Sequence, residues 1–201
     1  MAWSRQTGSG KHHHRQTPPK PEEDDTKRRI EYAVGLWRNA TPLSGTLGEQ
    51  YFIEQRKLDV RQFDLRHCLR WNENARTIIA LMRHPMTDTP CGIHRTFLNE
   101  DGTKRERKML GKQGMVKLTP DEEVTLGIGI TEGVEDGLAV LLSGWAPIWA
   151  ATSAGSLAKF PIFHGIESLT IFPTPIQPAL RLHRSALTAG FLQGERPAFH
   201  T

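Results

Sequence analysis

Cysteine is nearly absent from this sequence of 201 residues: there are two, Cys68 and Cys91, and neither belongs to a CxxC pair. Their scarcity excludes a zinc ribbon and argues against a disulfide framework. Long apolar runs are absent as well, and the N-terminus lacks the apolar core of a signal peptide. We therefore expect a cytoplasmic protein that uses no zinc and has no membrane partner.

The overall composition is that of a globular protein with a mildly basic surface. Hydrophobic residues make up 37% and charged residues 24% of the chain, and the formal net charge is +4. The length suits one full domain, or one small domain with fragments of another. A positive charge of this size is compatible with a nucleic-acid partner without requiring one.

The first 29 residues are predicted to be a disordered tail. They are rich in polar residues, with almost nothing apolar after Trp3, so they cannot bury enough surface to offset the entropy of ordering. His12, His13 and His14 could bind a metal ion loosely, but a metal site needs ligands held by a fold, and a solvated tail is the preferred interpretation.

Apolar spacing predicts helices first and then antiparallel strands. Ile30, Ala33, Val34 and Trp37 form one helical stripe, and Thr46 can cap a second helix. Residues 77–82 form a buried strand in this interpretation. Residues 92–98 and 104–110 flank Asn-Glu-Asp-Gly, a good hairpin signal, while residues 85–90 are expected to be a loop.

Basic residues gather around the predicted hairpin. They are Arg83, His94, Arg95, Lys104, Arg105, Arg107, Lys108 and Lys112. On an antiparallel ribbon such side chains could follow a phosphate backbone, and we select His94, Arg95, Lys104, Lys108 and Lys112 as candidate nucleic-acid contacts. The alternative is an ordinary solvated strand face, with His94 as a structural histidine.

The segment 125–144 predicts a strand, a tight turn and a helix, because its apolar period changes from two to about 3.6. The turn carries Glu132 and Gly133. A carboxylate at the carboxyl end of a strand lies where α/β folds bind ligands, although Glu132 could simply complement the helix dipole. Further strands are expected at 146–151 and 166–172, with a loop at 153–156, which together suggest a parallel sheet with right-handed crossovers.

Several motifs in order resemble primase-like proteins of phages and mobile elements. Residues 37–46 (WRNATPLSGT), 92–98 (GIHRTFL) and 108–111 (KMLG) resemble the domain that precedes the toprim fold. Residues 132–139 (EGVEDGLA), 149–155 (WAATSAG) and 169–172 (LTIF) resemble the first half of the toprim domain. The resemblance implies an α+β to α/β fold: a small mixed pre-toprim domain over 30–118, then an incomplete Rossmann-like toprim sheet over 119–172.

The resemblance also implies chemistry. Toprim proteins hold Mg²⁺ through a glutamate and a later Asp-x-Asp, and by position Glu132 would be that glutamate, acting as metal ligand and general acid/base. Glu135 matches a second acidic position, while Asp136 and Gly137 replace small residues. Complete relatives would join nucleotides on a single-stranded DNA template, with a helicase encoded nearby as a candidate partner. Mg²⁺ suits this role because hard oxygen ligands hold it against phosphate oxygens.

The sequence departs from this family after Phe172. Where Asp-x-Asp should follow, the chain has residues 173–179 (PTPIQPA), with no later aspartate and only Glu195 as an acidic residue. We therefore expect an incomplete, weak Mg²⁺ site and weak or absent catalysis. Two alternatives stay open: a non-catalytic nucleic-acid-binding module, and a toprim nuclease with the same metal site.

We predict that residues 173–201 are an aberrant tail translated out of frame from a formerly complete toprim gene. The peptide PTPIQPA can be encoded by CCG ACT CCG ATC CAG CCG GCN, and one restored G in front gives Ala-Asp-Ser-Asp-Pro-Ala-Gly, the missing motif. Sequencing the gene tests this: if G does not precede the codons of Thr174 and Ile176, the restored aspartates disappear and the idea fails.

Overall fold

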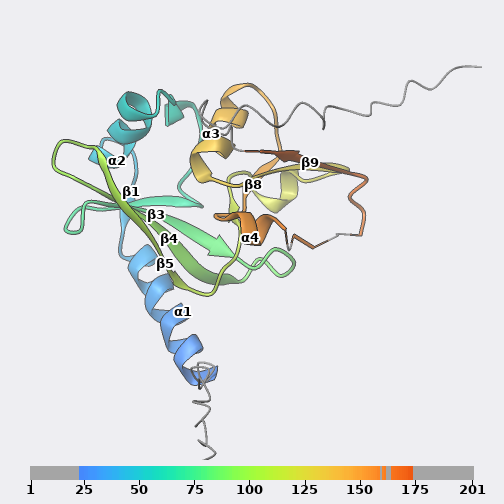
Figure 1. Ribbon diagram of the computed structural model, residues 1–201, viewed down its shortest axis with the longest axis horizontal. Coiled ribbons are helices and arrows are strands. Elements are labelled where there is room, and N and C mark those ends of the chain that lie inside the picture. The colour runs from blue at the N-terminus through green and yellow to red at the C-terminus, as the bar shows by residue number, and fades with distance from the viewer. Residues whose placement is uncertain (1–22, 159, 162–163, 174–201) are drawn as a thin grey trace, which may run out of the picture.

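A computed structural model describes residues 23–158, 160–161 and 164–173. The fold is mixed α/β, with two sheets and a few helices, as the sequence predicted (Figure 1). Its elements, in order, are α1 (Glu23–Arg38), β1 (Thr41–Pro42), α2 (Leu47–Gln50), η1 (Tyr51–Gln55), η2 (Val60–Gln62), β2 (Leu69–Asn72), β3 (Thr77–Arg83), β4 (Pro90–Leu98), β5 (Lys104–Gly111), β6 (Val116–Lys117), η3 (Asp121–Glu123), β7 (Gly127–Thr131), α3 (Val134–Leu142), β8 (Ile148–Ala150), α4 (Ala154–Leu157) and β9 (Ser168–Phe172).

The first sheet is antiparallel, in the order β1-β2-β3-β4-β5. Helix α1 covers one face, which we call the helix face, where Ala33 and Trp37 pack near Ile79 and Ile93. The opposite face, here the inner face, packs against the second half of the chain. Because β3 is covered on both sides, its run from Thr77 to Met82 is buried throughout, as predicted for this strand.

The predicted start of α1 was wrong. The helix begins at Glu23, so residues 23–29, expected to belong to a disordered tail, are helical. Acidic residues in a first helical turn interact favourably with the helix dipole, and Asp24 and Asp25 lie in that turn. The preceding residues, including His12, His13 and His14, lie outside the described part of the chain.

The predicted hairpin is confirmed by β4 and β5. Arg95 lies opposite Lys108 and His94 opposite Met109, and the register shifts between Phe97 and Leu98. In the turn, the Asn99 amide donates to the Thr103 carbonyl and Gly102 has a φ of +78°, which glycine adopts without strain. The capped helix after Thr46 is confirmed too: the Thr46 hydroxyl accepts a hydrogen bond from the Glu49 amide.

The second sheet has the order β6-β8-β7-β9. Strands β8 and β9 run parallel to β7, as expected, but β6 is antiparallel to β8, so the sheet is mixed rather than parallel. Strand β6 falls in the range 30–118 assigned to the first predicted domain, yet it pairs in this second sheet. The change from one sheet to the other therefore occurs between Gly111 and Val116.

Two smaller expectations also need correction. Residues 153–156 were predicted to be a loop, but α4 begins at Ala154, with the Ser153 hydroxyl accepting from the Ser156 amide. Strand β2 was not predicted, because Arg70 and Asn72 interrupt its apolar pattern. Both cysteines are buried free thiols.

The two sheets share one hydrophobic cluster. It includes Trp71 and Ile78 from the first sheet and Leu138 and Ile148 from the second half. Helix α3 can approach β8 closely because residue 137 is glycine: a Cβ there would lie 2.4 Å from Leu118 Cδ1 and 3.2 Å from Ile148 Cγ2. The fold is therefore built around a core that neither half completes alone.

Strand β9 is one edge of the second sheet among the described residues, and β6 is the other. Leu169 and Ile171, on one face of β9, are 47% and 51% exposed. The predicted out-of-frame tail falls almost wholly on residues 174–201, which lie outside the described residues. No helix in the described ranges is long and apolar enough to cross a membrane.

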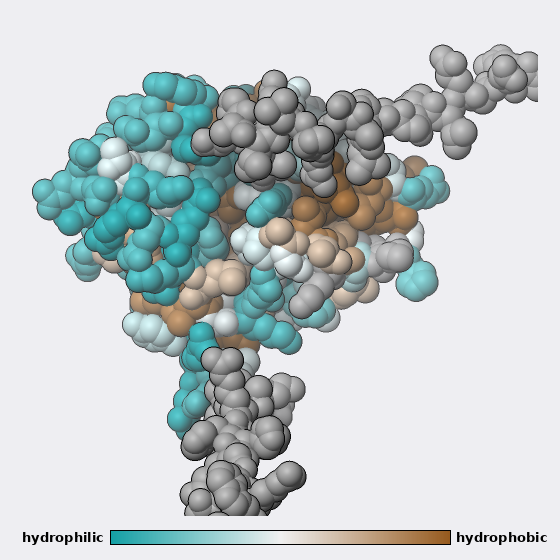
Figure 2. Space-filling model, viewed as in Figure 1, coloured by the Kyte–Doolittle hydropathy of each residue, from teal (hydrophilic) through white to brown (hydrophobic). Residues whose placement is uncertain are grey.

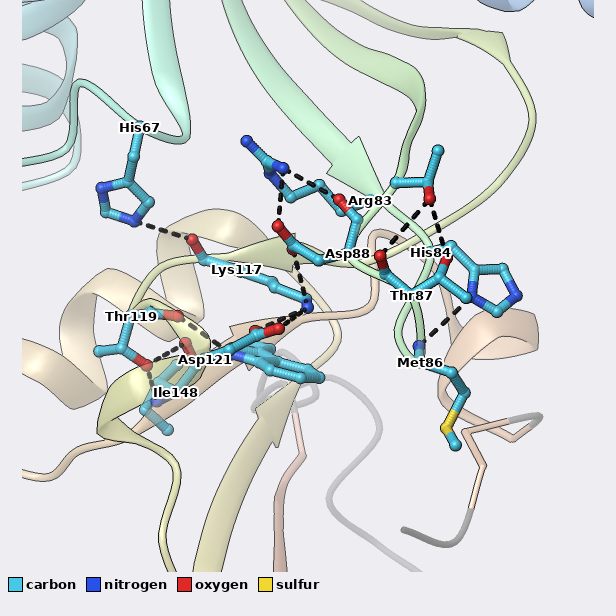
Figure 3. Close-up of polar contacts among 12 residues, drawn as sticks. His67, Arg83, His84, Met86, Thr87, Asp88, Lys117, Thr119, Asp121 and Ile148 are labelled. Carbon is cyan, nitrogen blue, oxygen red and sulfur yellow. Dashed lines mark hydrogen bonds and ion pairs between the residues drawn. The ribbon is translucent and has the colours of Figure 1, made fainter.

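A buried lysine joins the end of the first sheet to the second (Figure 3). The Lys117 side chain is 3% exposed, and its ammonium lies 2.9 Å from Asp88 Oδ1 and 2.6 Å from Asp121 Oδ1. It also lies 4.4 Å from the centre of the Trp149 ring. Arg83, at the end of β3, pairs with Asp88 at 2.8 Å. One chain of charges thus connects β3, the loop after it, β6 and η3.

Replacing this lysine should destabilise the protein. We expect Lys117→Met to lower the free energy of unfolding by about 3 kcal/mol, the low end for a broken buried ion pair, because both aspartates keep contact with solvent. Methionine retains the apolar stem, so the loss reports the charge. Urea unfolding measures it, with Arg61→Met, which breaks an exposed pair with Asp59, as a control expected to change little. Equal stability of Lys117→Met and wild type would contradict this role.

Candidate functional site

The turn between β7 and α3 places Glu132 at the carboxyl end of β7. This strand lies between β8 and β9, and both run parallel to it. The predicted strand, turn and helix are confirmed, and the Thr131 hydroxyl closes the turn by donating to the Gly133 carbonyl at 2.9 Å. Glu132 thus lies at an edge where parallel sheets usually bind ligands.

Glu132 is half-buried and has no side-chain partner within the described residues. Its carboxylate is therefore open to a ligand. The neighbouring Asp136 carboxylate lies against the start of the helix, since a Cβ on Gly133 would be 2.9 Å from Asp136 Oδ2. Of the acidic side chains in this turn, Glu132 is the one whose oxygens are not held by another group.

Glu135, the second predicted metal ligand, is held by two donors from distant parts of the chain. The Tyr51 hydroxyl donates to Glu135 Oε1 at 2.9 Å, and the Arg107 guanidinium pairs with the same carboxylate. The Glu135 side chain is only 8% exposed. Helix α3, strand β5 and η1 therefore meet at this carboxylate.

These contacts determine how the two groups titrate. Burial would raise the pKa of the Glu135 carboxyl, but the Arg107 charge, a backbone hydrogen bond and the Tyr51 hydroxyl outweigh it, so the pKa lies below its ordinary value. Burial and the Glu135 charge raise the pKa of Tyr51 to about 12. At neutral pH the site thus holds an ionised carboxylate between a guanidinium and a neutral phenol.

The described residues do not fit a complete magnesium site. Mg²⁺ needs several converging oxygen ligands, and Arg107 places a positive charge where a second ligand would have to meet the metal. Across the described ranges, no three residues among His, Cys, Asp and Glu are grouped to hold a metal ion. One carboxylate, Glu132, is in position, and we derive no chemical step through a metal.

Positive side chains surround Glu135. The pKa of Lys104 is lowered chiefly by the Arg107 charge, then by burial, while Glu135 opposes the shift. The pKa of His94 is lowered by burial and then by Arg107, which keeps this histidine neutral at pH 7. Arg56, after η1, also acts on Glu135 and Lys104. The surroundings of the buried Glu135 are therefore cationic, and the open carboxylate of Glu132 lies three residues earlier, in the turn before α3.

The predicted basic ribbon is divided between two faces of the hairpin. His94 and Lys104 interact with the Arg107 and Glu135 group on the inner face. Arg95 and its cross-strand partner Lys108 point to the helix face, since neighbouring residues of a strand alternate. Lys112 follows β5 and lines a hollow of about 260 Å³ with Gln113 and Phe160. The five candidates therefore do not form one continuous surface.

Three residues of the site were not predicted from the sequence as site residues. Tyr51 lies in the helix predicted after Thr46 and was not singled out, Arg107 was one basic residue among eight, and Arg56 carried no signal. Tyr51 lies 84 and Arg107 lies 28 positions from Glu135. No local pattern relates residues so far apart in the chain.

Removal of the Arg107 guanidinium should leave the buried Glu135 carboxylate without its charged partner and so destabilise the protein. We expect Arg107→Gln to lower the free energy of unfolding by about 3 kcal/mol at pH 7, with part of the loss restored by adding Glu135→Gln. Chemical unfolding of the two single variants and the double variant measures the coupling.

The pH dependence provides a second check on the same pair. In the wild type, the stability from the depressed pKa is present above the ordinary value of 4.5 and is lost as pH falls through the folded pKa. In Arg107→Gln, burial instead disfavours the ionised form, so acid relieves the penalty. The difference between the two proteins should therefore narrow as the pH falls from about 4.5 through the folded pKa of the wild type, and a constant difference would show that Glu135 is not the group responsible.

Comparison with known protein families gives a match only in the first half of the chain. Residues 27–120 match a domain of unknown function, DUF7146. That range contains most of α1, the whole first sheet and β6, and it ends before the turn that carries Glu132 and the helix that carries Glu135. No curated protein matches the chain, and neither does any solved structure.

Proposed function

We propose that this chain is part of a toprim protein of the phage or mobile-element DNA primase type. In this role it binds single-stranded DNA and nucleotides, and complete relatives carry out Mg²⁺-dependent nucleotidyl transfer. The observation that carries the proposal is the position of Glu132: an open carboxylate at the carboxyl end of a parallel strand, three residues before Glu135, around which cations of the preceding sheet gather.

The chemistry of such a site suits a polyanionic substrate. Phosphoryl transfer depends on positioning and on offsetting negative charge, and cationic side chains contribute to both. Three cations lie within electrostatic range of Glu135: Arg107, Lys104 and Arg56. Glu135 lies in the first turn of α3, three residues after Glu132.

A second candidate is a nucleic-acid-binding module without catalysis. It is favoured by one specific observation, the ion pair between Arg107 and Glu135, which removes a carboxylate from metal binding. The two candidates differ in their response to metal. If Glu132 acts alone, millimolar Mg²⁺ should barely change the unfolding temperature, because linked stabilisation scales as RT ln(1 + [L]/Kd). A rise of several degrees that disappears in Glu132→Gln would instead favour the catalytic form.

Binding to single-stranded DNA tests the proposal itself. Fluorescence anisotropy with a labelled oligothymidylate should show affinity that falls with salt, by a slope of about 0.7 per neutralised phosphate. Replacing both Lys104 and Lys108 by Ala should lower the slope, whereas Lys27→Ala, an exposed lysine in α1, is the control expected to leave it unchanged. If wild-type protein shows no salt-dependent binding, the proposed function is wrong.

A further inference from the structure

One aromatic ring on the first sheet is surrounded by positive charge. The Phe97 ring centre lies 5.4 Å from the Arg95 guanidinium, 5.4 Å from the Arg105 guanidinium and 5.9 Å from the Lys108 ammonium. Phe97 is partly exposed, in contrast to its neighbour Leu98, which is 0% exposed. We call Arg95, Phe97, Arg105 and Lys108 the hairpin platform.

The hairpin platform lies on the helix face, opposite the Glu135 group. Arg95 is the cross-strand partner of both Ile79 and Lys108, so it belongs to the row of side chains on the α1 side of the sheet. Helix α1 covers this face around Ile93 and Leu110 but leaves the charged end of the hairpin open. In Figure 2, hydrophilic residues cover the side of the molecule where Figure 1 places the hairpin.

The charge of the hairpin platform is not balanced locally. Glu106, which lies opposite Phe97, is the carboxylate among these side chains, at 2.8 Å from Lys108 and 3.8 Å from Arg105. Three cations against one carboxylate give a local charge of about +2 at neutral pH. The buried Arg95 Nε has no hydrogen-bond partner within the described part of the chain. Such a surface attracts a polyanion.

A nearby arginine provides a contrast. Arg70 also stacks on an aromatic ring, 3.9 Å from the centre of Trp37, but its guanidinium donates to the Arg38 carbonyl at the end of α1. That arginine caps a helix, which explains its position structurally. The Arg105 and Lys108 side chains, at 49% and 56% exposure, make no comparable contacts with the backbone of the described residues.

We infer that the hairpin platform is a stacking site for single-stranded nucleic acid, with a base on Phe97 and the adjacent phosphates on Arg95, Arg105 and Lys108. Proteins that bind single strands without sequence preference combine aromatic rings with cations that follow the backbone. The exposed cations now above the ring can move to the phosphates when a base replaces them. This inference rests on the proposed function, and it places the strand on the face opposite Glu132.

The test separates stacking from charge. Anisotropy is measured with a labelled oligothymidylate and with an abasic oligomer that has the same phosphodeoxyribose backbone. Phe97→Leu, which keeps the apolar bulk, should weaken oligothymidylate binding roughly 5- to 150-fold, as expected for the loss of one stacked base, and should leave abasic binding unchanged. Arg95→Gln should weaken binding of both oligomers and lower the salt slope by about 0.7.

Arg61→Gln is the control, because it removes an exposed cation of η2, outside the hairpin. It should leave both affinities near those of the wild type. If Phe97→Leu and Arg95→Gln bind like the wild type while Lys104→Gln weakens binding, the strand lies on the inner face. The inference then fails and the proposed function stands. If the wild type binds neither oligomer, both fail.

Discussion

The carboxylate of Glu135 is the point on which the arrangement of the two halves depends. It is buried, so it needs partners, and it obtains a hydroxyl from η1 and a guanidinium from β5. A buried carboxylate without a partner would destabilise the fold by several kcal/mol. The main effect of the contact is therefore to prevent that penalty. It also determines which side of the hairpin lies beside the turn that carries Glu132.

The same contact decides what Glu135 can do. A carboxylate committed to Arg107 is a poor ligand for a divalent cation, whatever its position in the sequence suggests. Glu132, three residues earlier, makes no such ion pair because it lies in the half-buried turn before α3, whereas Glu135 lies in the buried first turn of the helix. Two acidic residues in one short motif thus have different roles, which follow from burial and from their neighbours.

Strand alternation has a comparable effect on the basic residues. In the sequence they form one cluster, but the hairpin sends Arg95 and Lys108 to one face and His94 to the other. The inner face receives cations that surround a buried anion, and the helix face receives cations that surround an aromatic ring. The first group is tied to the packing of the two halves, and the second is open to a partner. A single basic ribbon therefore becomes two surfaces with different electrostatic surroundings.

What the sequence determined by itself is local. The stripe from Ile30 to Trp37, the Thr46 cap, the hairpin and the change of period around Glu132 depend on neighbouring residues, and these elements were predicted correctly. The mixed α/β class followed from their order. What only the tertiary structure decided depends on contacts between distant residues: the antiparallel β6, the shared core, the buried Lys117 and the partners of Glu135. Burial and pairing arise when separate elements pack together, and no spacing along the chain encodes which hydroxyl or guanidinium will meet a given carboxylate.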